Sequence, residues 1–250
     1  MNRISQARII FITGTDTGVG KTLLTGLFLD HLRQSGCHAL AMKPFCSGSH
    51  ADTEFLRAVQ DGELTIEKIT PFFFAEPLAP LVAARRHRRL IRLRQVLRQI
   101  NRIASRCQCM LIEGIGGLLV PLGEGFTVRD LIARLDCEVV LVSCNRLGTI
   151  NHTLLTVKAL KPLANKGLKA VLMSHKYKDA AMHSNQVILT EMLAPTPVLS
   201  VPFLGAKMER FGALKNNRRK MQKPLARILG SDIVSSAFFV RTKPMAAKNS

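Results

Sequence analysis

A glycine-rich loop near the start of the chain constrains its fold more than any other feature. An apolar run at residues 9–13 leads directly into GTDTGVGKT at residues 14–22, and a helical pattern continues from residue 23. A strand and a helix joined by such a loop, with Gly-Lys-Thr at the junction, are typical of a phosphate-binding loop. The sequence therefore predicts a nucleoside triphosphate site on an α/β fold.

The residue types of this loop suit phosphate binding. Glycines allow backbone N–H groups to converge on phosphate oxygens, and the helix N-terminus adds a partial positive charge. We expect Lys21 to reach the β- and γ-phosphates and the Thr22 hydroxyl to bind Mg²⁺. Five residues separate Gly14 from Gly20, where the usual pattern has four. A simple glycine-rich turn before a helix is the alternative. The nucleotide contacts expected from the loop are Gly18, Val19, Gly20, Lys21, Thr22 and Leu23.

The rest of the chain alternates short apolar runs with longer amphipathic ones. This alternation predicts a mainly parallel sheet flanked by helices, like that of P-loop NTPases, in a single domain. The expected strands are residues 7–13, 39–43, 110–113, 139–143, 170–174 and 198–201. The expected helices are residues 21–35, 52–59, 90–106, 128–135, 150–166 and 183–193. No apolar run reaches the roughly 18 residues of a membrane span, and no secretory signal is visible, so a cytoplasmic protein is expected.

An acidic residue ends one of the expected strands. Glu113 closes the apolar run at residues 110–113, and Gly114-Ile115-Gly116-Gly117 follows it. Ligands of open α/β sheets bind at the carboxyl ends of the strands, which places Glu113 beside the phosphate loop. We therefore expect Glu113 to be a metal ligand and Gly114, Ile115 and Gly116 to approach the nucleotide. A purely structural carboxylate is the alternative.

Four spaced motifs together resemble the dethiobiotin synthetase family. They are the loop at residues 14–22, KPFCSGS at residues 43–49, EGIGG at residues 113–117 and LGTINH at residues 147–152. The likeness extends over about residues 7–205, and little matches after Gly205. We therefore expect a synthetase-like domain at residues 1–205 and a basic C-terminal segment at residues 206–250. The last residues, 242–250, are expected to be frayed.

The resemblance implies an ATP-, Mg²⁺- and CO₂-dependent ligase acting on 7,8-diaminononanoate. In the family, one amine of the substrate captures CO₂ as a carbamate, and ATP phosphorylates the carbamate. The second amine then displaces phosphate from the mixed anhydride and closes a cyclic urea. Such chemistry requires aligned partners and neutralised charge more than covalent catalysis.

The same resemblance assigns roles residue by residue. Lys43 matches the family's active-site lysine and, with Lys21, is the expected catalytic residue. Thr17 and Ser47 match substrate-binding positions. Asp52 matches a second metal carboxylate, so that Thr22, Asp52 and Glu113 would hold Mg²⁺. Asn151, at the start of a predicted helix, would meet the substrate of a partner subunit in a homodimer.

Two departures from the family concern the nucleotide site. Gly18 replaces an acidic residue common inside the loop, which removes one negative charge near the triphosphate. The family usually carries Asn-Asp after its fifth strand to read the base, whereas Ser174-His175 stands here. Serine and histidine lack the paired donor and acceptor of an amide, so loose base selectivity is expected. Pro202, Phe203 and Leu204 match a second base-contacting loop.

The net charge of +19 is the feature that the resemblance does not explain. Residues 85–106 carry nine arginines and no acidic residue. We expect these arginines to share one helix and to face solvent, with weak polyanion binding and no specific nucleic-acid partner. One alternative is a partitioning-type DNA-associated ATPase, although Asp16 stands where that group has a signature lysine. A related P-loop ligase with another amine substrate is the other alternative.

Overall fold

A six-stranded parallel sheet forms the centre of the molecule. The computed structural model describes residues 7–176, 180–205 and 211–230. The sheet contains β1 (Arg8–Gly14), β2 (Ala39–Met42), β5 (Cys109–Gly117), β8 (Glu138–Cys144), β9 (Leu168–Met173) and β10 (Val198–Val201). The strands lie in the order β10-β9-β8-β1-β5-β2, and every pair is parallel. The predicted α/β fold is confirmed.

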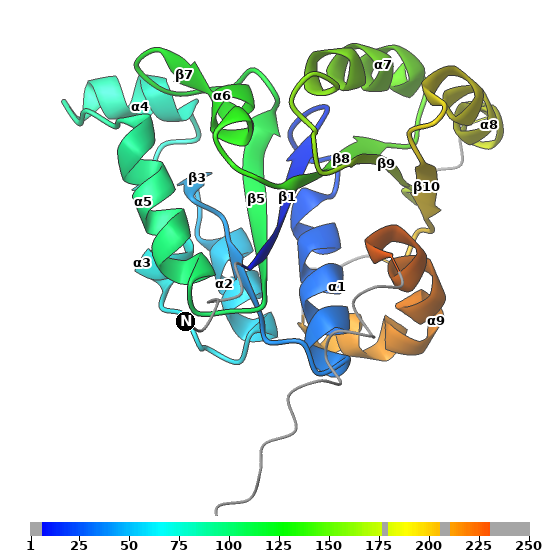
Figure 1. Cartoon of the computed structure of the whole chain (residues 1–250), viewed down its shortest axis with the longest axis horizontal. Coiled ribbons are helices and arrows are strands. Elements are labelled where there is room, and N and C mark those ends of the chain that lie inside the picture. The colour runs from blue at the N-terminus through cyan, green and yellow to red at the C-terminus, as the bar shows by residue number, and fades with distance from the viewer. Residues whose placement is uncertain (1–6, 177–179, 206–210, 231–250) are drawn as a thin grey trace, which may run out of the picture.

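Helices pack on both faces of this sheet (Figure 1). Those expected from the sequence are α1 (Lys21–Gln34), α2 (Ala51–Val59), α5 (Leu93–Ala104), α6 (Val128–Ala133), α7 (Thr149–Leu160) and α8 (Ala181–Leu193). Short helices α3 (Ile66–Ile69) and α4 (Pro80–Arg86) were not expected, nor was α9 (Phe211–Leu229). None of the helices within the described ranges is long and apolar enough to cross a membrane.

Two small sheets were also missed. β3 (Phe45–Ser47) pairs with β4 (Phe72–Phe74), and β6 (Pro121–Gly123) pairs with β7 (Phe126–Thr127). Strands of two or three residues are too short for a hydrophobic period to be visible in the sequence. β3 follows β2 closely in the chain, and its pairing with β4 places Ser47 beside the main sheet.

The expectation that the arginines of residues 85–106 share one helix was wrong. Arg85 and Arg86 end α4, and α5 does not begin until Leu93. Arg88 adopts a left-handed backbone conformation, with φ of 51°, which stops the first helix. Arg92 then caps the N-terminus of α5, and its backbone N–H donates to the Gln95 side chain at 2.8 Å. The basic stretch is therefore divided between two helices and a turn.

The basic C-terminal segment includes a helix that packs on the domain. Leu214, Met221 and Leu225 of α9 are buried, and α9 contacts α1 and β10. Arg218 Nε donates to Asp30 Oδ2 of α1 at 2.8 Å. The boundary at residue 205 stays a prediction, and the expected frayed tail at residues 242–250 lies outside the described residues.

Helices α1 and α2 cross at a glycine. A Cβ atom added to Gly26 of α1 would lie 2.3 Å from Cε1 of Phe55 of α2, far inside van der Waals contact. Phe55 is itself buried, so it fills the space that the missing side chain leaves. The glycine thus sets how closely α2 approaches the helix that follows the phosphate loop.

Candidate active site

The phosphate loop lies between the carboxyl end of β1 and the start of α1, as the sequence predicts. Gly20 precedes α1 with φ of 100°, a left-handed conformation that glycine adopts without strain. A Cβ atom at Gly20 would lie 3.1 Å from the Met173 side chain at the end of β9. Lys21 is buried, and its Nζ donates to the Asp16 carbonyl at 2.7 Å. The loop is therefore closed around its own lysine and packed against the end of β9.

A pocket of about 530 Å³ opens in front of this loop. It lies at the carboxyl ends of β1, β2 and β5 and is bordered by the start of α4. Most of the predicted site residues line it, namely Thr17, Gly18, Gly20, Lys21, Thr22, Leu23, Lys43, Ser47, Asp52, Glu113, Ile115 and Gly116. The fold thus brings residues from five separate stretches of sequence into one cavity.

Lys43 and Glu113 form the polar centre of the pocket. Lys43 Nζ donates to Glu113 Oε1 at 2.7 Å and also pairs with the Asp52 carboxylate. The Thr22 hydroxyl donates to the same Glu113 oxygen at 2.7 Å. Glu113 is 1% exposed and Lys43 is 6% exposed, so the ion pair is shielded from water. Helix α1, strand β5 and helix α2 meet at this cluster.

The two lysines of the pocket differ in their electrostatics. Burial lowers the pKa of Lys43, but the carboxylates of Glu113 and Asp52 outweigh burial and hold the pKa above its ordinary value. Burial also acts most strongly on Lys21, and there it prevails, lowering the pKa to about 8. Lys43 is therefore a permanent cation, whereas Lys21 loses its proton in the mildly alkaline range.

The oxygen atoms near Lys43 suit a hard divalent cation. Thr22, Asp52 and Glu113 offer one hydroxyl and two carboxylates, and Mg²⁺ prefers oxygen ligands completed by water and phosphate. Glu113 Oε2 is buried and has no hydrogen-bond partner among the described residues. Among the residues that the structure describes, no group of three or more His, Cys, Asp or Glu side chains is arranged to bind a metal ion. A magnesium site here would thus need the hydroxyl and outside oxygens.

The predicted substrate-binding hydroxyls both reach the pocket. Ser47 Oγ is buried and has no hydrogen-bond partner in the described structure. Thr17 lies across the pocket mouth, where its hydroxyl is close to Gly116. An unused buried hydroxyl is costly unless a ligand satisfies it. Ser47 is therefore well placed to bind a polar ligand.

Two predicted nucleotide contacts lie behind the pocket surface. Val19 is 4% exposed and packs against Gly14 beneath the loop. A Cβ atom at Gly114 would lie 3.2 Å from the Phe11 ring, which indicates that this glycine is needed for packing between strands. Neither residue lines the pocket. Both support its wall.

The residues predicted to contact the base lie together, to one side of the pocket. Ser174 and His175 follow β9, and Pro202, Phe203 and Leu204 follow β10. Ser174 N donates to the Val201 carbonyl at 2.9 Å, which joins the two segments. His175 Nε2 is buried without a partner in the described residues. Asn151 is exposed on the first turn of α7 and lies outside the pocket.

Several pocket residues were not singled out as site residues from the sequence. These are Cys46, Pro77, Leu78, Ala79, Pro80 and Val120. Pro80 could have indicated this segment in the sequence, because proline is favoured at the first position of a helix and Pro80 is the first residue of α4. The missed residues give the pocket an apolar wall opposite the charged cluster.

Comparisons with known proteins show which family the chain resembles. A family model described as an AAA domain matches residues 8–209. The ATP-dependent dethiobiotin synthetase BioD of Bacillus licheniformis is 37% identical over 196 residues, which cover 76% of this chain and 83% of that protein. The BioD of Akkermansia muciniphila is 34% identical over 193 residues, covering 77% of this chain and 90% of that protein.

Solved structures resemble the fold at much lower identity. The structure of pNOB8 ParA bound to nonspecific DNA matches with a TM-score of 0.56 and 12% identity, covering 92% of this chain and 98% of that chain. The MinC:MinD cell division complex of Aquifex aeolicus matches with a TM-score of 0.53 and 13% identity, covering 97% and 100%. These likenesses concern the fold alone. By sequence, the chain belongs to the ATP-dependent dethiobiotin synthetase family.

Proposed function

We propose that this protein closes a cyclic urea on 7,8-diaminononanoate, using CO₂ and ATP, to give dethiobiotin. The observation that carries the proposal is the convergence of Lys21, Lys43 and Glu113 on one pocket in front of the phosphate loop. The sequence identity to named synthetases supports the same activity. The pocket offers cations for a triphosphate and the unpartnered Ser47 hydroxyl for a second ligand.

The reaction is the one that the resemblance to the family implies, and the groups of the pocket suit it. One amine nitrogen of the substrate attacks CO₂ and loses a proton, which gives a carbamate. A carbamate oxygen then attacks the γ-phosphorus of ATP, and ADP leaves. The second amine attacks the carbonyl carbon of the resulting anhydride, phosphate leaves, and the ring closes. Ser47 and Thr17 would bind the carbamate, while Lys21 and Lys43 would neutralise charge on the phosphoryl oxygens.

Mg²⁺ is part of the proposal. Thr22, Asp52 and Glu113 would hold it, where it would neutralise the negative charge of the β- and γ-phosphates. Lys43 now occupies both carboxylates, so it would turn toward the phosphoryl group when ATP binds. This places the permanent cation of the pocket next to the atoms that react.

We also propose that the enzyme acts as a homodimer in the cytoplasm. Exposed apolar side chains support a second subunit near Asn151: Leu147 is 79% exposed and Leu155 is 60% exposed. Leu147 precedes α7, and Leu155 follows Asn151 by about one helical turn. In a dimer, Asn151 would then reach the substrate of the partner. Sedimentation of the wild type and of a Leu155→Glu variant tests this, because only the wild type is expected to dimerise.

Mass spectrometry of the product tests the function directly. The wild type is incubated with diaminononanoate, ¹³C-bicarbonate, Mg²⁺ and ATP. We expect dethiobiotin with one heavy carbon, and none when ATP is omitted. ATP hydrolysis that DNA stimulates, without any cyclic urea, would contradict the proposal and favour a partitioning-type ATPase.

A further inference from the structure

Strand β2 delivers Lys43 to the pocket although it lies at an edge of the sheet. Its one neighbour in the sheet is β5, and Lys43 follows Met42 directly. On the open side, the backbone groups of Ala39, Ala41 and Lys43 point away from β5, because alternate residues of a strand bond to opposite sides. An edge strand with free backbone groups is a weak support for a buried lysine.

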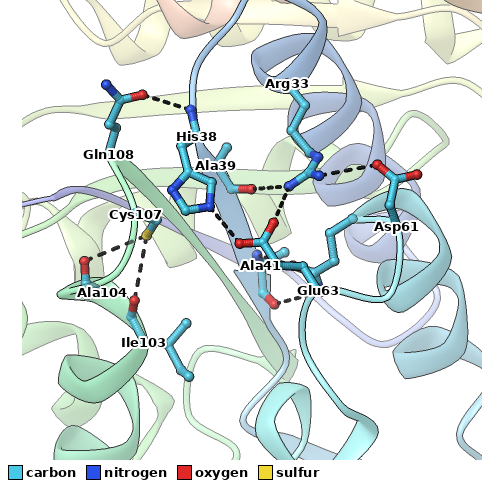
Figure 2. Close-up of polar contacts among 11 residues, drawn as sticks. Arg33, His38, Ala39, Ala41, Asp61, Glu63, Ile103, Ala104, Cys107 and Gln108 are labelled. Carbon is cyan, nitrogen blue, oxygen red and sulfur yellow. Dashed lines mark hydrogen bonds and ion pairs between the residues drawn. The ribbon is translucent and has the colours of Figure 1, made fainter. Parts of the chain in front are cut away.

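Here the open side is occupied at every alternate residue (Figure 2 shows Ala39 and Ala41). Arg33 Nη1 donates to the Ala39 carbonyl at 3.2 Å. Lys43 N donates to the Ile69 carbonyl at 3.0 Å. Between them, Gln60 binds both groups of one residue: Ala41 N donates to Gln60 Oε1 at 3.1 Å, and Gln60 Nε2 donates to the Ala41 carbonyl at 3.3 Å.

Gln60 is unusual among these three supports. It is fully buried, with 0% of its surface exposed, and its side chain contacts the strand as a neighbouring strand would. A neutral amide is suited to this, because it presents one donor and one acceptor side by side. Burying such a group is unfavourable unless both bonds form. The residue is therefore fixed in one arrangement.

Gln60 also ends helix α2, whose other end carries Asp52. Gln60 is the C-cap residue of α2, and Asp52 is in its first turn. Asp52 pairs with Lys43. Lys43 follows, by two residues, the Ala41 whose backbone is hydrogen-bonded to Gln60. Helix α2 is thus tied to β2 at both ends. A shift of its C-terminal end would move Asp52 relative to Lys43 and Glu113.

We propose that Gln60 is a positioning residue for this reaction: by fixing α2 on the edge of β2, it aligns Lys43 and Asp52 with the bound triphosphate. The inference rests on the proposed function for its chemistry. Gln60 does not line the pocket, so it acts through the two charged residues. The phosphate loop is carried by β1 and α1, to which Gln60 makes no hydrogen bond in the described structure.

The test compares Gln60→Met with two controls. Methionine keeps the volume of glutamine and loses both bonds. We expect kcat to fall between about tenfold and a hundredfold, because a misplacement of about 1 Å suffices for such a loss. The KM for ATP is expected to stay within about twofold, because the lysine and amides of the loop are untouched. Gln60→Glu keeps the acceptor for Ala41 N and should give an intermediate kcat.

The controls separate positioning from general loss of stability. Gln108→Ala removes another glutamine that holds this strand, through His38 N at 2.7 Å, but at the end distant from Lys43. Leu189→Ala destabilises the fold in α8, away from the pocket. Both should keep the wild-type kcat once the folded fraction is counted. An equal loss of kcat in Leu189→Ala and Gln60→Met would overturn the inference.

Hydrogen exchange provides a readout that does not depend on turnover. In Gln60→Met, the peptides covering residues 39–43 and 51–59 should exchange faster than in the wild type. The peptide covering residues 14–22 should be unchanged. Unchanged exchange at residues 39–43 would contradict the inference, whether or not the enzyme forms dethiobiotin. A wild type that forms no dethiobiotin would refute the proposed function alone.

Discussion

Charged side chains gather at both ends of the strands of the sheet, which we call the carboxyl edge and the amino edge, but they differ in burial and pairing. At the carboxyl edge, Lys43 and Glu113 are almost fully buried, and Glu113 Oε2 and Ser47 Oγ lack partners in the described residues. At the amino edge, Arg33 donates to Glu63 at 3.0 Å and to Asp61 at 3.2 Å (Figure 2). His38 is 2.6 Å from the other Glu63 oxygen.

The difference separates stability from function. Buried polar atoms without partners destabilise a fold unless water, an ion or a ligand satisfies them. The amino-edge network is partly exposed and internally paired, and such pairs contribute only about 0–1 kcal/mol each. In the proposed function, charge at the carboxyl edge would serve ligand binding and catalysis, whereas charge at the amino edge pairs within the fold.

Removing the pocket lysines should give the largest effect. We expect Lys21→Ala and Lys43→Ala each to lower kcat/KM by about 10²–10³, since a positioned donor to developing charge contributes that much. The matched control is Arg33→Ala at the amino edge, which should keep the wild-type rate and lose about 1 kcal/mol of stability. Steady-state kinetics and thermal unfolding measure both. Near-normal turnover in Lys43→Ala would remove this residue from the mechanism.

The next effect concerns the metal. Glu113→Gln should raise the Mg²⁺ concentration needed for half-maximal activity by at least about tenfold, because an amide oxygen is neutral and a weaker ligand. Glu63→Gln, the corresponding change at the amino edge, should leave the Mg²⁺ requirement unchanged. Activity assays over a range of Mg²⁺ give the answer. Identical curves for Glu113→Gln and the wild type would exclude Glu113 as a ligand.

The lowered pKa of Lys21 predicts a pH dependence. Burial lowers this pKa to about 8, so the free enzyme loses a phosphate-binding cation above that pH. We expect the KM for ATP to rise above pH 8, by up to about tenfold per pH unit. The unfolded chain holds this proton more tightly, so the charged lysine disfavours folding below pH 8, and stability rises as the pH approaches 10.5.

Lys21→Met separates these two consequences of the pKa. It should be more stable than the wild type at pH 7 and should lack the Lys21-dependent rise in stability above pH 8. Glu63 at the amino edge titrates in the opposite sense. Burial raises its pKa, but bonds from His38 and Arg33 outweigh burial and lower it, so its contribution to stability is lost only as the pH falls below the ordinary range of a glutamate.

A smaller effect is expected at the base-contacting end of the carboxyl edge. Ser174-His175 stands where the family has an amide and an acid, so CTP and GTP should support turnover within about tenfold of ATP, the equivalent of one or two hydrogen bonds. Ring closure assayed with each nucleotide measures this. A preference for ATP of about a thousandfold would show that another residue reads adenine.

The smallest effect on turnover should come from polyanions that bind the exposed arginines of α5, which lie at neither edge. Arg94, Arg98 and Arg102 are exposed along α5 and form no ion pair in the described structure. We expect DNA or RNA to bind this surface weakly at low salt, to be released near about 0.2 M salt, and to leave turnover unchanged. Binding titrations at two ionic strengths, alongside assays with DNA, measure both. Sequence-selective binding at physiological salt would contradict this.

The sequence predicted the parts of the molecule that local patterns encode. The strand, loop and helix around Lys21 could be predicted because turn chemistry and hydrophobic period agree there. Glu113 was predicted beside the phosphate loop because ligands of such sheets bind at the carboxyl ends of the strands. Lys43 and Asp52 were added to the site by the resemblance to the family. The structure brings these residues together as expected, and their roles stay predictions.

The remaining features depend on contacts between distant residues. Gln60 is an ordinary helix-end residue in the sequence, and its bond to Ala41, 19 residues away, exists only after folding. The division of the arginine stretch depends on one left-handed residue, Arg88, which no hydrophobic period reveals. The buried α9 was missed because its apolar residues, among them Leu214 and Met221, are sparse among many cations.

The crossing of α1 and α2 at Gly26 has a consequence for the evolution of this enzyme. Phe55 fills the place of a Cβ atom at Gly26, so the two positions are epistatic: a side chain at one becomes acceptable only when the other becomes smaller. In a full substitution scan scored by product formation, Gly26 should appear as intolerant as Lys43, although it touches no substrate. Pairing Gly26→Ala with Phe55→Leu should restore part of the lost activity, which no second change would do for Lys43.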